Sequence, residues 1–153
     1  MGRRIQGALG FTLAIALALG VGSAGAAEKI KFTQAWIPQG DVAWLWAAKV
    51  KGFWERRGLD VSIDRGYGSA EAVKQVALGN YDYTAADCGS MVVAKGRGLD
   101  LINVGIIHHV SPKGVGSLKG KGITRPKDLE GKRVATSAAS SVTLLWPAFA
   151  RAS

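Results

Sequence analysis

The sequence is poor in the residues that mark several classes of protein. It contains one cysteine and two histidines among 153 residues. A single cysteine excludes an internal disulfide, so we expect an ordinary hydrophobic core with Cys88 as a small buried residue within it. His108 and His109 have no acid or cysteine at ligand spacing. We therefore expect them to be polar residues of a hinge, and the sequence predicts no metal site and no cofactor.

Acidic residues are also scarce. The chain has 20 Lys and Arg against 11 Asp and Glu, a formal net charge of +9. Such a surplus can attract nucleic acid, an anionic membrane surface or anionic small ligands. The basic residues are scattered, however, and their densest group, residues 113–132, is broken by glycines and lacks interleaved aromatics. This pattern favours a solvated surface and predicts no nucleic-acid partner.

Long apolar runs are missing after residue 27. Before it, residues 8–21 form a charge-free stretch of about 14 residues, short of the roughly 20 that a spanning helix needs. Arg3 and Arg4 precede this stretch, and the small residues 23–27 follow it. That order is typical of a secretory signal peptide. We therefore expect residues 1–27 to be cleaved near Ala26–Ala27 and the remainder to be a soluble periplasmic protein, in contact with a membrane only through a partner.

Strand-like and helix-like patterns alternate along the rest of the chain. Alternation of polar and apolar residues predicts strands at 29–35, 59–64 and 82–86, and a nearly all-apolar run predicts a doubly buried strand at 101–107. Apolar spacings of three and four predict helices at 42–57, 69–78, 89–95 and 142–152. Weaker strand patterns occur at 115–118 and near 132–135. The order predicts an α/β fold with a parallel-type sheet and helices on both faces.

In open sheets of this kind, ligands bind beyond the carboxyl ends of the strands. Trp36, after the first strand, is either a stacking surface for a ligand or a core residue. Ser69 opens a helix whose free N–H groups suit an anion, although a plain helix cap explains it equally well. Asp87 caps the next helix or accepts a hydrogen bond from an amine.

Four further polar residues complete the predicted ligand-binding set. Gln39 lies in the loop after the first predicted strand, and Ser90 lies in the loop after the third predicted strand. Ser140 and Ser141 open the helix predicted at 142–152, where they would mirror Ser69. Two helix mouths that face each other across a cleft would suit an anionic ligand. We find no catalytic pair of nucleophile and base, so no catalytic residue is predicted.

Several segments, taken in order, resemble one family. The matching stretches are residues 32–38, 47–61, 68–82 and 125–134, and the last contains the sequence Lys-Asp-Leu-Glu-Gly-Lys. Together they resemble periplasmic solute-binding proteins of ABC importers for nitrate, sulfonates, taurine or thiamine pyrimidine precursors. The resemblance implies the two-lobed type II periplasmic binding protein fold, with residues 28–110 as the first lobe and 111–153 as the incomplete start of the second.

The same resemblance implies a function that does not include catalysis. The chain would be a monomer that binds a small solute in a cleft between lobes and delivers it to a membrane permease. The alternative is an enzyme of the same fold, thiamine pyrimidine synthase. Alignment to that family places its essential lysine at Ala86 and its histidine at Ser90. Since neither side chain is present, we expect the solute-binding function.

A last alternative is an inactive fragment. The chain resembles a truncated product that holds one lobe and the opening of the next. Such a piece would leave an apolar helix face uncovered, formed by Leu144, Leu145, Trp146 and Phe149. We therefore expect the isolated chain to aggregate readily.

Overall fold

The computed structural model describes residues 26–111 and 113–153. Its centre is a three-stranded sheet of β1 (Glu28–Gln34), β2 (Leu59–Asp64) and β3 (Tyr83–Ala85). The spatial order is β2-β1-β3, and both pairs are parallel. Glu28 pairs with Leu59 at one end, and Gln34 pairs with Ala85 at the other. All three strands therefore direct their carboxyl ends to one edge of the sheet.

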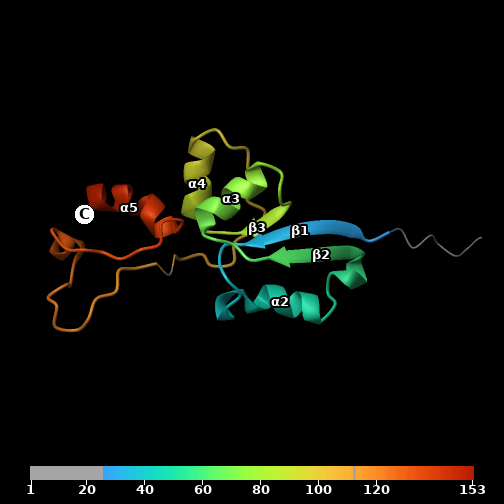
Figure 1. The fold of residues 1–153 in the computed structure, drawn as a ribbon, viewed down its shortest axis with the longest axis horizontal. Helices are drawn as coiled ribbons and strands as arrows, with labels where there is room; N and C mark the ends of the chain where they lie inside the picture. The colour runs from blue at the N-terminus through green and yellow to red at the C-terminus, as the bar shows by residue number, and fades with distance from the viewer. Residues whose placement is uncertain (1–25, 112) are drawn as a thin grey trace, which may run out of the picture.

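Helices cover both faces of this sheet. Helix α2 (Ala43–Val50) lies on one side, whereas α3 (Ser69–Ala77) and α4 (Cys88–Gly96) lie together on the other (Figure 1). Helix α5 (Ser141–Ala152) packs against the ends of α3 and α4 after a long connection that contains the 3₁₀ turn η3 (Pro126–Leu129). The predicted α/β class and the parallel sheet with helices on both faces are confirmed.

The hydrophobic core follows this layering. Leu45 from α2 is almost fully buried, as is Val61 from β2. On the opposite face, Val73 of α3 packs with Ala94 of α4 and with Leu101, just beyond α4. Burial of these apolar side chains holds α2 and the α3–α4 pair to the sheet.

The strand predicted at 101–107 is wrong. Only Leu101 is buried, and the side chains of Ile102 and Val104 are 82% and 80% exposed. The segment adopts no regular structure and does not pair with β3. The strand patterns at 115–118 and 132–135 are likewise irregular in the structure. An apolar sequence forms a strand only where a neighbouring strand accepts its backbone hydrogen bonds, and these segments lack one.

Two further predictions need correction. The helix expected over 42–57 is divided into a 3₁₀ turn (Gly40–Val42), α2 and a second 3₁₀ turn (Glu55–Arg57). It is interrupted at Gly52, whose φ of 63° is left-handed, and it ends as predicted at Gly58, whose φ is 72°. Cys88, expected to be buried, is exposed at the first position of α4, whereas Ser90 in the same turn is buried.

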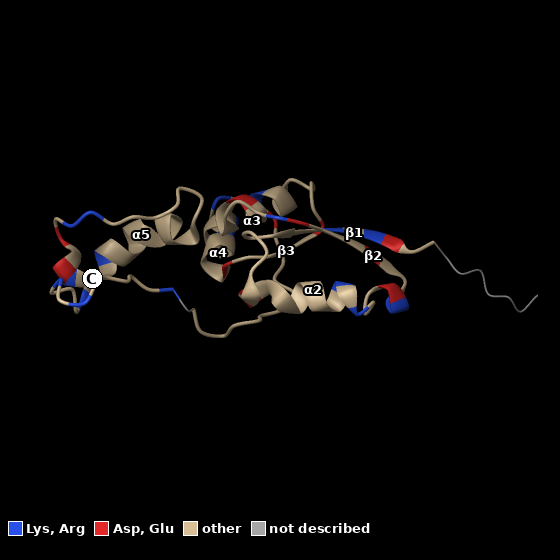
Figure 2. Ribbon diagram, turned by 60° about the horizontal axis from the view of Figure 1, so that its bottom comes forward, with Lys and Arg blue, Asp and Glu red and all other residues tan. Residues whose placement is uncertain are grey.

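The charged side chains are spread over the surface of the described residues rather than gathered on one face (Figure 2). Within the described ranges, no helix has the length and apolar character needed to cross a membrane. The predicted signal peptide, apart from Ala26 and Ala27, lies outside the described residues, and both the cleavage and the periplasmic location stay predictions.

Candidate functional site

The loops that follow β1 and β2 cross each other at the carboxyl edge of the sheet. The Gly66 N–H donates to the Trp36 carbonyl at 3.1 Å, and the Gly68 N–H donates to the Ala35 carbonyl at 2.8 Å. A Cβ on Gly66 would lie 1.8 Å from the Gln34 carbonyl oxygen. Only glycine permits this approach, so the two loops are fixed together through backbone atoms.

The segment before α5 also contacts these crossing loops. A Cβ on Gly68 would lie 1.9 Å from the Ala139 carbonyl oxygen, and Gly68 has a φ of 135°. On α4, a Cβ at Gly89 would lie 2.7 Å from the side chain of Leu145. Helix α5 is therefore seated directly on the amino-terminal turns of α3 and α4.

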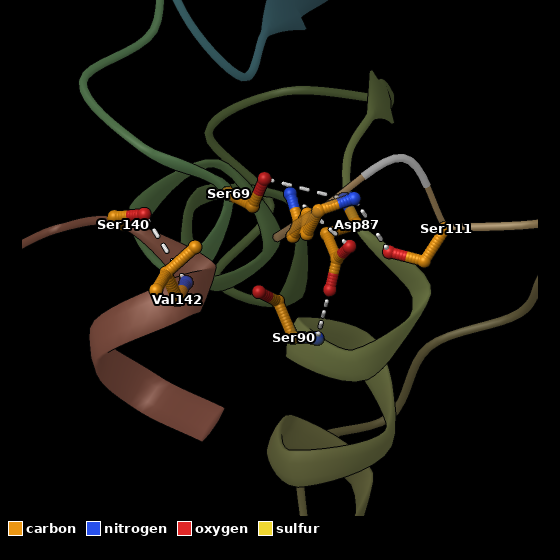
Figure 3. Close-up of polar contacts among 7 residues, drawn as sticks. Ser69, Asp87, Ser90, Ser111, Ser140 and Val142 are labelled. Atoms are coloured by element: carbon orange, nitrogen blue, oxygen red, sulfur yellow. Dashed lines mark hydrogen bonds and ion pairs between the residues drawn. The ribbon is translucent and has the colours of Figure 1, made fainter. Parts of the chain in front are cut away.

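Ser69 and Asp87 are joined at this edge. The Asp87 N–H donates to the Ser69 hydroxyl at 3.2 Å, which links the start of α3 to the start of α4 (Figure 3). Asp87 caps α4, because its Oδ1 accepts from the Ser90 N–H at 3.3 Å. Its Oδ2 forms an ion pair with the Lys113 ammonium at 3.3 Å. The capping role for Asp87 is confirmed, whereas Gly68, not Ser69, is the N-cap of α3.

The serines at the start of α5 lie close to this junction. Ser140 caps α5, and its hydroxyl accepts from the Val142 N–H at 3.1 Å (Figure 3). Ser141 is buried. We expected the starts of α3 and α5 to face each other across a cleft, but the Ala139 backbone packs against Gly68. The two helix ends form a packed contact in this structure.

Trp36 and Gln39 lie beyond β1 and are exposed. Neither side chain is a core residue, and Gln39 precedes the 3₁₀ turn Gly40–Val42 without a side-chain cap. His108 and His109 are exposed in the irregular segment after Leu101. Within the described ranges, no group of three or more His, Cys, Asp or Glu is placed to hold a metal ion.

Three buried polar side-chain atoms lack a hydrogen-bond partner among the residues that the structure describes: Gln34 Nε2, Thr84 Oγ1 and Ser90 Oγ. Gln34 ends β1, Thr84 is the central residue of β3, and Ser90 lies in the first turn of α4. The Gln34 Oε1 already accepts from the Trp46 indole at 3.3 Å. Gln34 pairs with Ala85 and Thr84 pairs with Thr33, so the Gln34 and Thr84 side chains lie on opposite faces of the sheet. An unpartnered buried polar group is costly, and the place of Gln34 at the carboxyl edge of the sheet points to a polar ligand there.

Sequence reasoning identified Ser90 but missed Gln34 and Thr84. Both occur inside predicted strands, where alternation alone indicates only which face a residue occupies. A glutamine at the last position of a strand in an open parallel sheet was the signal for Gln34. Nothing in the sequence distinguishes Thr84 from a structural threonine.

One tyrosine near the strand ends has a perturbed pKa. The Tyr81 hydroxyl donates to the Asp64 carboxylate at 2.9 Å. This hydrogen bond, together with partial burial and the negative charge of Asp64, raises the pKa of Tyr81 above its ordinary value. The hydrogen bond ties the end of β2 to the turn before β3.

The chain is similar to a set of curated enzymes. It is 28% identical over 90 residues to the 4-amino-5-hydroxymethyl-2-methylpyrimidine phosphate synthase of Schizosaccharomyces pombe. The matched segment covers 59% of this chain and 26% of that protein. It is 28% identical over 108 residues to the Saccharomyces cerevisiae synthases THI11 and THI13. This match covers 70% of this chain and 32% of each relative. The chain thus spans about a third or less of the length of these relatives. No solved structure matches it significantly.

These names overturn two expectations from the sequence. The main functional prediction, a non-catalytic solute-binding component that delivers its ligand to an importer permease, is contradicted, because the curated relatives are named as synthases. The prediction that the protein is not an enzyme is contradicted for the same reason. The resemblance was correct at a coarser level, since residues 39–148 match the family described as "NMT1/THI5 like". The chain therefore belongs to the NMT1/THI5-like family.

Proposed function

We propose that this chain belongs to an enzyme that forms 4-amino-5-hydroxymethyl-2-methylpyrimidine phosphate, the product in the names of its curated relatives. The matched residues 39–148 include β2, β3 and the loops that lead into α3 and α4. The proposal therefore rests on the region that forms the carboxyl edge of the sheet.

The observation that carries the proposal is the buried, unpartnered Gln34 Nε2 at that edge. An aminopyrimidine offers ring nitrogens that accept a hydrogen bond and an amino group that donates one. The Gln34 amide can donate to such a ring nitrogen. Binding of the ring supplies the missing partner and offsets the cost of burying this group.

The proposal assigns no catalytic role to Ala86 or Ser90. These residues occupy the positions that the resemblance gives to the lysine and histidine of the synthase. The experiments must therefore measure product formation itself as well as binding.

A growth test and a binding test examine the proposal. The gene is introduced into a strain that lacks this synthase, and growth without added pyrimidine is scored. In parallel, the purified chain is titrated with the pyrimidine phosphate by calorimetry. We expect growth and one-to-one binding, and absence of both would overturn the proposal.

Two variants locate the binding site. Gln34→Leu removes the amide donor and should weaken binding about tenfold, because a site built around that donor loses its partner. The control is Thr84→Val, which removes a buried hydroxyl from the opposite face of the sheet. Equal affinity of Gln34→Leu and Thr84→Val would contradict this placement of the ligand.

We also propose that residues 28–110 form the first lobe of a two-lobed periplasmic-binding-like fold and that residues 111–153 begin the second. The change from paired strands to an exposed irregular chain after Leu101 supports this division. Limited proteolysis should then cut first between residues 102 and 125. Early cutting inside the sheet would contradict the division.

A further inference from the structure

A cavity lies between α3 and α4. Its volume is about 260 Å³, and Ala139, just before α5, and Leu144 of α5 contribute to its lining. The polar side chains that line it are Glu71, Lys74, Ser90 and Arg97. The proposed pyrimidine site uses none of these four residues.

Ser90 is the deepest polar group of the cavity. Its side chain is 99% buried, since its relative exposure is 1%. The hydroxyl has no hydrogen-bond partner among the described residues, although the Ser90 N–H is engaged by Asp87. In Figure 3 the hydroxyl points away from the Asp87 carboxylate, toward the side on which α5 lies. A buried hydroxyl that lines a cavity without a partner indicates a polar ligand.

Charge is distributed unevenly along the cavity. Glu71 lies in the first turn of α3, and Ser90 lies in the first turn of α4. Lys74 follows one turn later on α3, and Arg97 is the residue at which α4 ends. Within residues 26–111 and 113–153, neither Lys74 nor Arg97 forms an ion pair. The acidic and hydroxylic end of the cavity therefore lies at the helix starts, and two exposed cations, Lys74 and Arg97, lie further along α3 and α4.

We propose that this cavity binds a small zwitterion, a molecule with an ammonium group and an oxyanion. The ammonium group lies at the acidic end, where it donates to the Ser90 hydroxyl and the Glu71 carboxylate. One oxygen of Glu71 already accepts from the Gln75 amide at 2.6 Å, which orients the carboxylate. The oxyanion lies at the other end, between Lys74 and Arg97.

The size of the cavity supports a ligand of this class. Sites for drug-sized molecules are commonly about 300–1,000 Å³, so this cavity suits a smaller compound. Successive helical residues rise about 1.5 Å, so roughly 4.5 Å separates Glu71 from Lys74 along α3 and roughly 10.5 Å separates Ser90 from Arg97 along α4. The α3 spacing matches an ammonium and an oxyanion joined by a few carbon atoms, and the long Arg97 side chain must extend back along α4 to reach the same oxyanion. A ligand with one charge alone would leave the opposite end of the cavity without a partner.

Three matched probes test the proposal by calorimetry on the full chain. β-Alanine carries both charges, propionate carries only the carboxylate, and propylamine carries only the ammonium. We expect β-alanine to bind at least about tenfold more tightly than either single-charge analogue. Equal binding of propionate would show a simple cationic patch, and no binding of β-alanine would show an unliganded packing gap. Either result overturns the proposal.

Variants assign the two ends. Ser90→Ala should weaken β-alanine binding and leave propionate binding unchanged, whereas Lys74→Gln should weaken both. Lys119→Gln removes an exposed lysine outside the cavity and serves as the control. Thermal unfolding of each variant shows that the fold is retained. This inference stands apart from the pyrimidine proposal, because Gln34→Leu should leave β-alanine binding unchanged.

Discussion

Residues 28–100 and residues 101–153 have similarly apolar sequences but differ in how far their apolar side chains are buried. In the first region every predicted strand pairs with a neighbour, and α2, α3 and α4 each bury at least one apolar side chain, Leu45, Val73 and Ala94 respectively. In the second region the chain from 102 to 110 is exposed throughout, and α5 is the one α-helix among the described residues beyond 101. The comparison shows that a hydrophobic pattern becomes a core only where another element lies opposite it.

The sharpest way to break this comparison is to remove one large apolar side chain from each region. Leu45→Ala in α2 should lower the free energy of unfolding by about 2–5 kcal/mol, because it empties a buried site. Ile102→Ala should change it by less than about 0.5 kcal/mol, because that side chain is already exposed. Urea titration of both variants gives the two values. A comparable loss for Ile102→Ala would show that the second region has a core after all.

The seat of α5 on the first region is the next point to test. Gly68→Ala places a Cβ against the Ala139 carbonyl at a φ that only glycine adopts easily, which should cost about 1–3 kcal/mol in backbone strain alone. Hydrogen exchange should rise over residues 139–152 more than over β1 and β2. The control, Gly105→Ala, has open space around the new methyl group. Unchanged exchange in α5 would mean that the contact contributes nothing to its position.

A smaller effect is expected where Lys113 contacts the capping Asp87. Lys113→Gln removes the ion pair and should reduce stability by up to about 1 kcal/mol, since Lys113 is partly exposed. The loss should shrink as salt is added, because salt screens the attraction. Thermal unfolding at low and high salt measures it. A loss independent of salt would point to packing of the lysine stem instead.

The smallest expected effect lies within the second region, at the turn near η3. The backbone N–H of Thr124 donates to the Asp128 carboxylate at 2.9 Å and, with the Thr124 hydroxyl and Arg125, holds the pKa of Asp128 below its ordinary value. The ionised Asp128 carboxylate therefore stabilises the turn fully when the pH is above the ordinary pKa of an aspartate. This stabilisation is lost as the pH falls through the lowered pKa of Asp128 in the folded chain.

Amide exchange of Thr124 measures this loss. Protection should fall in acid for the unmodified chain, whereas Asp128→Asn should show weaker protection that does not vary over the same pH range. The ordered turn depends on charge in a region without a core of its own. An acid-insensitive Thr124 amide in the unmodified chain would contradict this account.

The sequence predicted the first region well because its signals are local. Alternation located β1 and β2, and Asp87 and Gly58 acted as the predicted helix cap and stop. The run at 101–107 failed because pairing depends on a neighbour that local pattern does not report. The prediction that Cys88 is buried was wrong because burial preference describes residue types and not their position on a particular helix turn.

The candidate site was predictable only in outline. The carboxyl edge and its loops follow from topology, and Asp87 was predicted there as a helix cap. The unpartnered atoms of Gln34 and Thr84 were not, because a missing hydrogen bond is a property of the packed structure. The α3–α4 cavity was also missed, since its lining comes from three helices that the sequence does not show to converge.

The crossing of the loops at Gly66 and Gly68 has a consequence for how this protein can change. Main-chain atoms alone set the spacing there, so neighbouring side chains such as Trp36 and Tyr67 are free to vary without moving the loops. New ligand preferences can therefore arise by substitution of those side chains, one at a time, while the backbone of the crossing loops stays unchanged. A substitution at either glycine would instead shift the frame itself and alter every contact at once.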